Sequence, residues 1–197
     1  MTRAAKATSR RMAAPGSPTW HAMLDGAECV LREEGYAALT SRRLAEYIGV
    51  KQRLVYYYFQ TMDDLIVETF DRLALREIER LREAASSKRP LREIWEVCIH
   101  TSDARLIAEF MALANRIKKL RAEVIRFIEE SRTIQVSALS AALKRKSKNN
   151  GIPAAALAML ATSVALSLTR EAELGVTAGH REIVAVFEAF LGEAEPK

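Results

Sequence analysis

The sequence predicts an all-α protein, and three features indicate this fold class. Apolar residues recur three and four positions apart through most of the 197 residues, as on the buried face of a helix. No useful stretch shows the strict apolar–polar alternation that is typical of a strand. Short breaks containing Gly, Pro or Ser separate the periodic segments. We therefore expect about nine helices, arranged as a three-helix N-terminal domain followed by a larger helical domain.

The first expected elements are a tail and a long helix. Residues 1–18 lack helical periodicity and carry four cations with several Ala, Ser and Pro residues, so we expect a flexible basic tail. A helix should follow over residues 19–34, capped by Thr19 and ended by Gly35. Its apolar side chains form a single stripe, which is expected to face the next two helices. The stripe consists of Met23, Leu24, Ala27, Val30 and Leu31.

Two short helices joined by a tight turn are expected between Leu39 and Phe59. Gly49 ends the first of them, because glycine enters the left-handed conformation of a helix C-terminus without steric cost. This apolar skeleton is typical of a helix-turn-helix unit, which completes a domain over residues 19–60. Its apolar positions are Leu44, Ala45, Ile48, Val50, Val55 and Tyr58.

The larger domain, residues 61–197, should contain the remaining six helices. Thr61 with the acids Asp63 and Asp64 predicts a capped start for the first of these. The polar segment 147–151 is the clearest linker in this half of the chain. The expected helices cover about residues 61–85, 90–101, 102–115, 118–146, 154–174 and 178–191.

Positive charge is concentrated near the N-terminus. The net charge is +5, and residues 1–60 hold nine Lys or Arg against five Asp or Glu. No acid occurs between Glu46 and Asp63, whereas Lys51 and Arg53 lie inside that interval. A basic, acid-free interval on a compact two-helix unit favours binding to a phosphate backbone.

Several classes of protein are disfavoured by the sequence. Cys29 and Cys98 are too few for a disulfide framework, so we expect reduced thiols. The N-terminus has no apolar run behind its cations, so it does not predict a secretory signal. The most apolar segment, residues 153–168, is short for a membrane span and contains three hydroxyl residues. We therefore expect a cytoplasmic protein without membrane association.

From about Thr19 to Leu65 the chain resembles the N-terminal DNA-binding domain of the TetR family of transcriptional regulators. This resemblance implies a regulator that binds double-stranded DNA, with repression as the family's commoner behaviour. The rest of the chain resembles the family only in being helical. The matching residues are Leu24, Ala27, Gly35, Tyr36, Thr40, Leu44, Ala45, Gly49, Val50, Tyr56, Tyr58, Phe59 and Leu65.

In a helix-turn-helix the second helix enters the major groove, and its first residues reach base edges. Lys, Arg and Gln can pair with base acceptors, Leu can contact a thymine methyl group, and Tyr hydroxyls can donate to phosphates. Thr40 resembles the family's cap of the preceding helix, beside a phosphate, and Arg42 adds a charge there. The expected DNA contacts are Thr40, Arg42, Lys51, Gln52, Arg53, Leu54, Tyr56 and Tyr57.

Some assignments near this surface stay open. Tyr58 and Phe59 continue the apolar face, so we expect them in the core rather than on DNA. Arg43 could contact DNA or could be a solvated charge. The chain departs from the family pattern at Lys51, where Ser or Thr commonly stands, and at Met62, where Lys is common. Both departures leave the fold intact and put single contacts in doubt.

The larger domain is expected to form a homodimer and to bind a small-molecule effector. Residues 154–168 are apolar nearly all round and need partners on several sides, although a monomer's own core could supply them. In TetR-like proteins the preceding helices enclose a small-molecule site, and the bulky residues here favour an apolar or amphipathic ligand. Each could also be ordinary core. The expected ligand contacts are Trp95, Cys98, Ile99, Phe110, Met111, Asn115 and Phe127.

Catalysis is not predicted. Cys98 and His100 lie two positions apart on one helix and would point to different faces, so they would not converge with Asp103. The three histidines show no metal-ligand spacing, and no glycine loop for phosphates or other cofactor motif is present. The alternative to a ligand-responsive repressor is a DNA-binding regulator controlled by a protein partner or by its own abundance.

Overall fold

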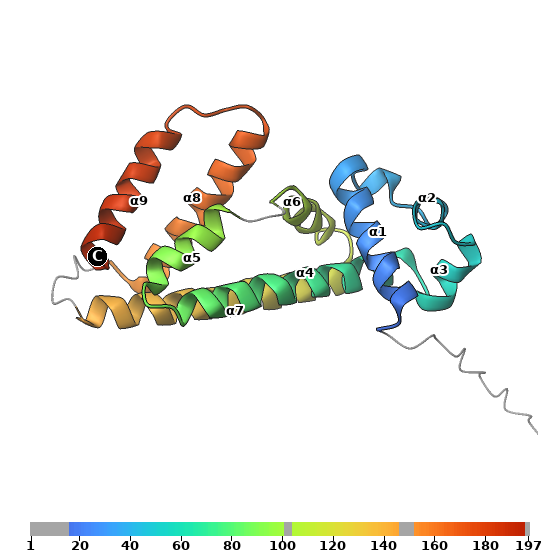
Figure 1. The fold of residues 1–197 in the computed structure, drawn as a ribbon, viewed down its shortest axis with the longest axis horizontal. Coiled ribbons are helices and arrows are strands. Elements are labelled where there is room, and N and C mark those ends of the chain that lie inside the picture. Colours follow the sequence, from blue (N-terminus) through green and yellow to red (C-terminus); the bar gives the residue numbers. More distant parts are fainter. Residues whose placement is uncertain (1–15, 101–103, 146–151, 196–197) are drawn as a thin grey trace, which may run out of the picture. The chain divides into compact units, whose positions relative to one another are not determined.

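The computed structural model describes residues 16–100, 104–145 and 152–195 (Figure 1). Within these ranges it contains nine α-helices, one short 3₁₀ helix and no strand, which confirms the all-α prediction. Most of the expected tail and the whole of the expected linker at 147–151 lie outside the described residues. The elements are α1 Pro18–Glu34, η1 Tyr36–Ala38, α2 Ser41–Tyr47, α3 Gln52–Tyr58, α4 Met62–Ala85, α5 Pro90–Ile99, α6 Ala104–Leu113, α7 Lys118–Arg145, α8 Ala154–Glu173 and α9 His180–Ala194.

The chain divides into two compact units, one ending at Thr69 and the other beginning at Phe70. In the first unit, the five apolar residues expected on one face of α1 are all inaccessible to solvent. The start of α1 differs from the prediction, because the cap is Ser17 and not Thr19. The Ser17 Oγ accepts the Trp20 amide proton at 3.2 Å. Pro18 then takes the first helical position, where a missing amide proton has no cost.

The turn between α2 and α3 forms as the sequence predicts. Gly49 has a φ of 71°, in the left-handed region, and the Val50 amide donates to the Ala45 carbonyl at 2.9 Å. The close approach of α1 to α2 depends on a second glycine. A Cβ atom on Gly26 would lie 2.7 Å from Cγ2 of Ile48, closer than real Cβ contacts. The absence of a side chain at Gly26 therefore lets α2 seat against α1.

The start of α4 is a reciprocal cap between Thr61 and Asp64. The Thr61 Oγ1 accepts the Asp64 amide proton at 3.1 Å, and the Asp64 carboxylate accepts the Thr61 amide proton at 3.1 Å. This arrangement confirms the capped start expected from the sequence. It satisfies two of the amide donors that a helix N-terminus leaves without partners.

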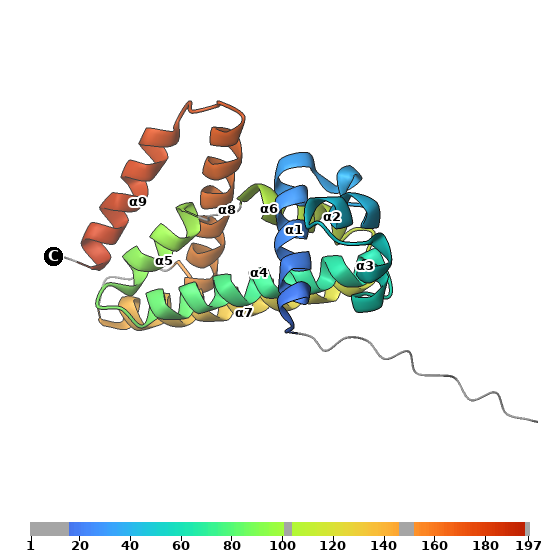
Figure 2. The same cartoon turned by 45° about the vertical axis from the view of Figure 1, so that its right-hand side comes forward.

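In the second unit, the part of α4 from Phe70 onward lies alongside α7, as Figures 1 and 2 both show. Phe70 packs edge-on against Phe110 of α6 and Phe127 of α7, with ring centroids 5.3 and 5.9 Å apart. Arg82 and Glu130 form an ion pair between α4 and α7. Helix α8 packs on both α5 and α7. This core is built from side chains that are far apart in the sequence.

Helix α9 is attached to α5 by ring stacking, by capping and by an ion pair between Arg92 and Glu188. The indole of Trp95 stacks on the ring of Phe187, with centroids 4.3 Å apart and planes 3° from parallel. The Glu195 carboxylate accepts the amide protons of Leu91 and Arg92 at 2.9 and 3.1 Å, so it caps the N-terminus of α5.

The bounds of α9 differ from the predicted 178–191. The helix starts at His180 because Gly179 is in the left-handed conformation, with a φ of 80°. It continues to Ala194, next to the residue that caps α5. No helix in the described part of the chain is both long enough and apolar enough to cross a membrane.

Candidate functional site

The N-terminal end of α3 presents polar side chains to solvent. Lys51, Gln52 and Arg53 are exposed, whereas Val55 and Phe59 are buried in the domain core. The two apolar residues anchor the inner side of α3 and so hold its outer side open. Leu54 is half-buried beside them. The exposed side chains are those expected from sequence to reach base edges.

A polar network from α2 orients two side chains of α3. Gln52 Nε2 donates to the Ser41 Oγ at 2.9 Å, and the Ser41 hydroxyl donates to the Tyr56 hydroxyl oxygen at 3.0 Å. Ser41 is buried, so its hydroxyl is a fixed reference point. The Tyr56 hydroxyl accepts in this network and keeps its own proton for another acceptor. Sequence reasoning missed Ser41, although its spacing from Leu44 and Ala45 places it on the inner face of α2.

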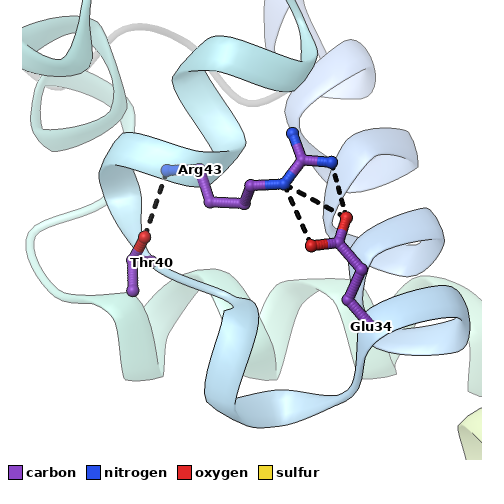
Figure 3. A network of polar contacts seen from close by, with 3 residues as sticks. All are labelled: Glu34, Thr40 and Arg43. Carbon is purple, nitrogen blue, oxygen red and sulfur yellow. Dashed lines mark hydrogen bonds and ion pairs between the residues drawn. The ribbon is translucent and has the colours of Figure 1, made fainter.

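Arg43 is part of the domain's internal structure, as Figure 3 shows. Its guanidinium donates three hydrogen bonds to the Glu34 carboxylate at 2.5 to 3.1 Å, joining α2 to α1. These bonds hold the pKa of the Glu34 carboxyl below its usual value. Its backbone amide donates to Thr40 Oγ1 at 3.1 Å, so Thr40 caps α2 as expected. Arg43 is thus not a lone solvated charge, because its pairing with Glu34 ties α2 to α1.

Arg42, the neighbouring residue, has a different environment. It makes a single hydrogen bond to Glu46 at 2.9 Å, and both side chains are largely exposed. Hydrogen bonding to Glu46 raises the pKa of Arg42, so its charge is permanent. An exposed pair of this kind is weak and exchanges readily for another anion.

The tyrosines that end α3 face different ways. Tyr57 is about half exposed, while Tyr58 is more deeply placed and its hydroxyl accepts a hydrogen bond from Ser17 at 3.2 Å. The structure therefore leaves Tyr57 available to a partner and ties Tyr58 to the start of α1. Phe59 is core, and Met62 is half-buried.

The larger unit contains an apolar cavity of about 320 Å³ between α5, α7, α8 and α9. Trp95 and Cys98 of the predicted ligand contacts line it. Phe110 and Phe127 instead pack on Phe70 in the core. Ile99, Met111 and Asn115 are also outside the lining. The lining residues are Leu91, Ile94, Trp95, Cys98, Gln135, Leu139, Leu157, Ala158, Leu160, Ala161, Val164, Ile183, Val186, Phe187, Phe190 and Leu191.

Few polar groups reach this cavity. Gln135, which is buried, accepts a hydrogen bond from Thr162 at 3.2 Å and places its Nε2 3.7 Å from the Cys98 sulfur. Burial raises the pKa of the Cys98 thiol to about 11, an effect larger than the opposing one of the Gln135 hydrogen bond. The buried Trp95 Nε1 has no hydrogen-bond partner among the described residues. Sequence reasoning did not single out Gln135, because a polar residue inside a long helix resembles a surface position.

Helices α8 and α9 carry large apolar side chains on their surfaces. Met159, Leu160 and Leu166 on α8 and Val186 on α9 are each about half exposed or more. Isolated exposed apolar residues are ordinary, but several on two consecutive helices favour a surface that binds another protein chain.

Comparison with known proteins agrees with the N-terminal geometry. Residues 23–69 match the family model described as bacterial regulatory proteins, tetR family. No curated protein matches the sequence.

Solved structures share the fold at low sequence identity. A TetR transcription regulator from Haloarcula marismortui superimposes with a TM-score of 0.72 and 16% identity, over 88% of this chain and 96% of that one. A proposed transcriptional regulator from Pseudomonas aeruginosa PAO1 gives 0.71 and 17%, over 89% and 90%. The triclosan complex of SmeT, the repressor of the Stenotrophomonas maltophilia efflux pump SmeDEF, gives 0.62 and 18%, over 80% and 81%.

Proposed function

We propose that the protein is a cytoplasmic repressor of transcription, on the premise that its N-terminal domain, which matches the tetR family model over residues 23–69, is the DNA-binding domain of such a regulator. It binds a palindromic operator as a homodimer and is released by a small apolar or amphipathic ligand. The observation that carries the proposal is the exposed run Lys51, Gln52 and Arg53 at the start of α3, held outward by the buried Val55 and Phe59.

In this proposal α3 lies in the major groove and reads bases with its first turn. Lys51 and Arg53 pair with guanine acceptors, and Gln52 pairs with adenine after exchanging its hydrogen bond to Ser41. Leu54 contacts a thymine methyl group. Gln52 gives up its hydrogen bond to Ser41 and gains two to adenine, so the exchange favours the DNA-bound orientation of its side chain.

Backbone contacts hold the domain in register. Tyr57 is exposed, and Tyr56 keeps a free hydroxyl proton, so both donate to phosphate oxygens. Arg42 exchanges Glu46 for a phosphate, since its existing pair is single and solvent-exposed. Thr40, which already caps α2, lies beside the same phosphate.

One domain touches few bases, so specificity requires two domains about one helical turn apart on DNA. The exposed apolar residues of α8 and α9 support a dimer formed by these two helices from each copy. In that arrangement the symmetry of the operator mirrors the two-fold axis of the protein.

Release follows if the effector favours a conformation in which the two domains are wrongly spaced for DNA. Ligand bound in the larger domain shifts α4, which runs from Met62 to Ala85 and continues from the DNA-binding domain. The coupling equals the difference in ligand affinity between the two conformations. The apolar cavity and the triclosan complex of SmeT support a small-molecule effector.

The DNA-binding proposal is tested by selecting bound duplexes from a random pool and then measuring affinity for the selected site. We expect a palindrome, and we expect Lys51→Ala/Gln52→Ala/Arg53→Ala to abolish selective binding. The control Arg116→Ala/Arg121→Ala also removes two positive charges, but from exposed positions of the larger unit. It should bind DNA as the unmodified protein does. Unchanged selectivity in the triple variant would refute the assigned role of α3.

A further inference from the structure

We propose that Ser41 is a positioning residue for DNA binding: its hydroxyl fixes the phenol of Tyr56 and leaves the phenol proton to be donated to a phosphate oxygen. This inference rests on the proposed function, because it explains how one of the proposed backbone contacts is prepared before DNA binds. It is carried by the 3.0 Å hydrogen bond between the buried Ser41 hydroxyl on α2 and the exposed Tyr56 on α3.

The fold holds Ser41 in one place. It is the first residue of α2, directly after the Thr40 cap, and is only 6% exposed. Leu44 and Ala45, on the next turn of the same helix, are buried in the domain core and fix this face of α2. Helix α3 packs on α2. The Ser41 hydroxyl is therefore a stationary partner for side chains on α3.

The inventory of protons gives the bond to Tyr56 its direction. A serine hydroxyl has one proton to donate and can accept two hydrogen bonds. Gln52 Nε2, which can only donate, bonds to Ser41 Oγ at 2.9 Å and so leaves the serine proton unused. Among the described residues the other partner of this hydroxyl is the Tyr56 oxygen. The serine proton therefore goes to Tyr56, and the phenol proton stays available for a different acceptor.

The bond to Tyr56 does not depend on Gln52. When Gln52 turns to adenine, Ser41 loses a hydrogen bond that it accepts and keeps the one that it donates. The tyrosine is thus held in the same position in the free protein and on DNA. A side chain that is already ordered loses less conformational entropy on binding than one that must first be ordered.

The two tyrosines that follow lack this combination. Tyr57 is exposed to a similar degree, 49% against 43% for Tyr56, but its hydroxyl makes no hydrogen bond among the described residues. The Tyr58 hydroxyl accepts a hydrogen bond from Ser17 at 3.2 Å, but its side chain is less exposed. Of the three, Tyr56 alone joins an exposed ring to a fixed hydroxyl.

The test is a double-mutant cycle between Ser41 and Tyr56, with the affinity of the full-length protein measured by fluorescence anisotropy. The probe is a labelled nonspecific duplex at low salt, which reports backbone contacts without base reading by Gln52. We expect Ser41→Ala and Tyr56→Phe each to lower this affinity at least about threefold, as the loss of one hydrogen bond allows. In the Tyr56→Phe background, Ser41→Ala should have no further effect, because the hydroxyl that it positions is absent.

The cycle separates positioning from a purely structural role. A structural effect of Ser41→Ala would remain in the Tyr56→Phe background, whereas a positioning effect disappears there. Tyr58→Phe is the matched control, since it removes the acceptor of a second serine–tyrosine bond in this domain, and it should leave the affinity unchanged. Ser41→Ala should remain folded, because Gln52 and Tyr56 are both exposed and water satisfies their polar groups.

The inference is overturned if Ser41→Ala binds as tightly as the unmodified protein, or if its effect is equally large with and without the Tyr56 hydroxyl. Should circular dichroism show that Ser41→Ala is unfolded, Tyr56→Phe is compared with Tyr57→Phe, and equal losses of affinity overturn the inference.

The proposed function fails separately, through unchanged selectivity of the triple variant Lys51→Ala/Gln52→Ala/Arg53→Ala. If that variant loses selectivity while Ser41→Ala has no effect, the positioning role is refuted and the proposed function stands.

Discussion

Replacing Arg42 by Gln should weaken DNA binding and its dependence on salt, whereas the same replacement of Arg43 should leave the salt dependence unchanged. The two residues are adjacent on α2 and carry the same charge. The Arg42 side chain is 80% exposed with one hydrogen bond to Glu46, while Arg43 is 37% exposed and donates three hydrogen bonds to Glu34. Only Arg42 can move to a phosphate at little cost.

The magnitude follows from counterion release. Each phosphate contact contributes about 0.9 to the slope of log K against log salt concentration, so the loss of one contact in each of two subunits lowers the slope by about 1.8. If this electrostatic contribution vanishes at 1 M salt, affinity at 0.1 M salt falls about 60-fold. Conversely, Glu46→Gln frees Arg42 from its partner and should strengthen binding.

The assay is fluorescence anisotropy of a labelled duplex over a series of KCl concentrations. Because the electrostatic contribution does not depend on sequence, a nonspecific duplex at low salt is sufficient. Circular dichroism must show that Arg43→Gln remains folded, since that change unties α1 from α2. An equal loss of slope in both variants, or a larger loss for Arg43→Gln, would refute the assignment of Arg42 to phosphate.

Three further results are expected. Gly26→Ala should destabilise the N-terminal unit by up to about 2 kcal/mol in thermal unfolding, because a Cβ atom there would crowd α2. Gly192→Ala is the control: the space around Gly192 is open, so this change should stabilise α9 by about 0.5–1 kcal/mol. Met159→Glu should raise the dimer dissociation constant, measured by sedimentation, at least about a hundredfold. Leu75→Glu is the control and should leave this constant unchanged, because Leu75 is as exposed as Met159 (62% and 63%) but does not lie on α8 or α9. For Cys98 the folded pKa is raised from 9.0 to about 11, so its contribution to stability is complete below pH 9 and is lost as pH rises to 11. Between pH 9 and 11 the free energy of unfolding, measured with denaturant, should fall by about 2–3 kcal/mol less in Cys98→Ala than in the unmodified protein. Identical pH profiles of the two proteins would contradict this.

The features that the sequence predicted correctly depend on residues close together in the chain. The apolar stripe of α1, the left-handed Gly49 and the Thr61 cap each need only a few neighbouring residues. The same holds for Thr40, which caps the amide three residues later. The cap of α1 was misplaced, because Ser17 and Thr19 both suit that role and Pro18 favours the earlier start.

The features that the sequence could not predict depend on which faces of distant helices meet. Arg43 finds Glu34 because α1 and α2 pack closely at Gly26, and periodicity alone gives no register between two helices. The cavity has the same origin, since α9 joins it through the stack of Phe187 on Trp95. The ligand contacts expected from the sequence therefore included Phe110 and Phe127, which pack on Phe70 instead of lining the cavity.

The position of α9 places a physical constraint on any mechanism of induction. A ligand in the cavity touches α9, and a partner copy on the proposed dimer surface also touches α9, so the two binding events share one element. If an effector lowers the affinity for operator, then operator lowers the affinity for that effector by the same factor, because binding linkage is reciprocal. An effector that weakens operator binding must itself bind less tightly when operator is present. A ligand that binds equally well to free and DNA-bound protein would occupy the cavity without acting as an inducer, however high its affinity.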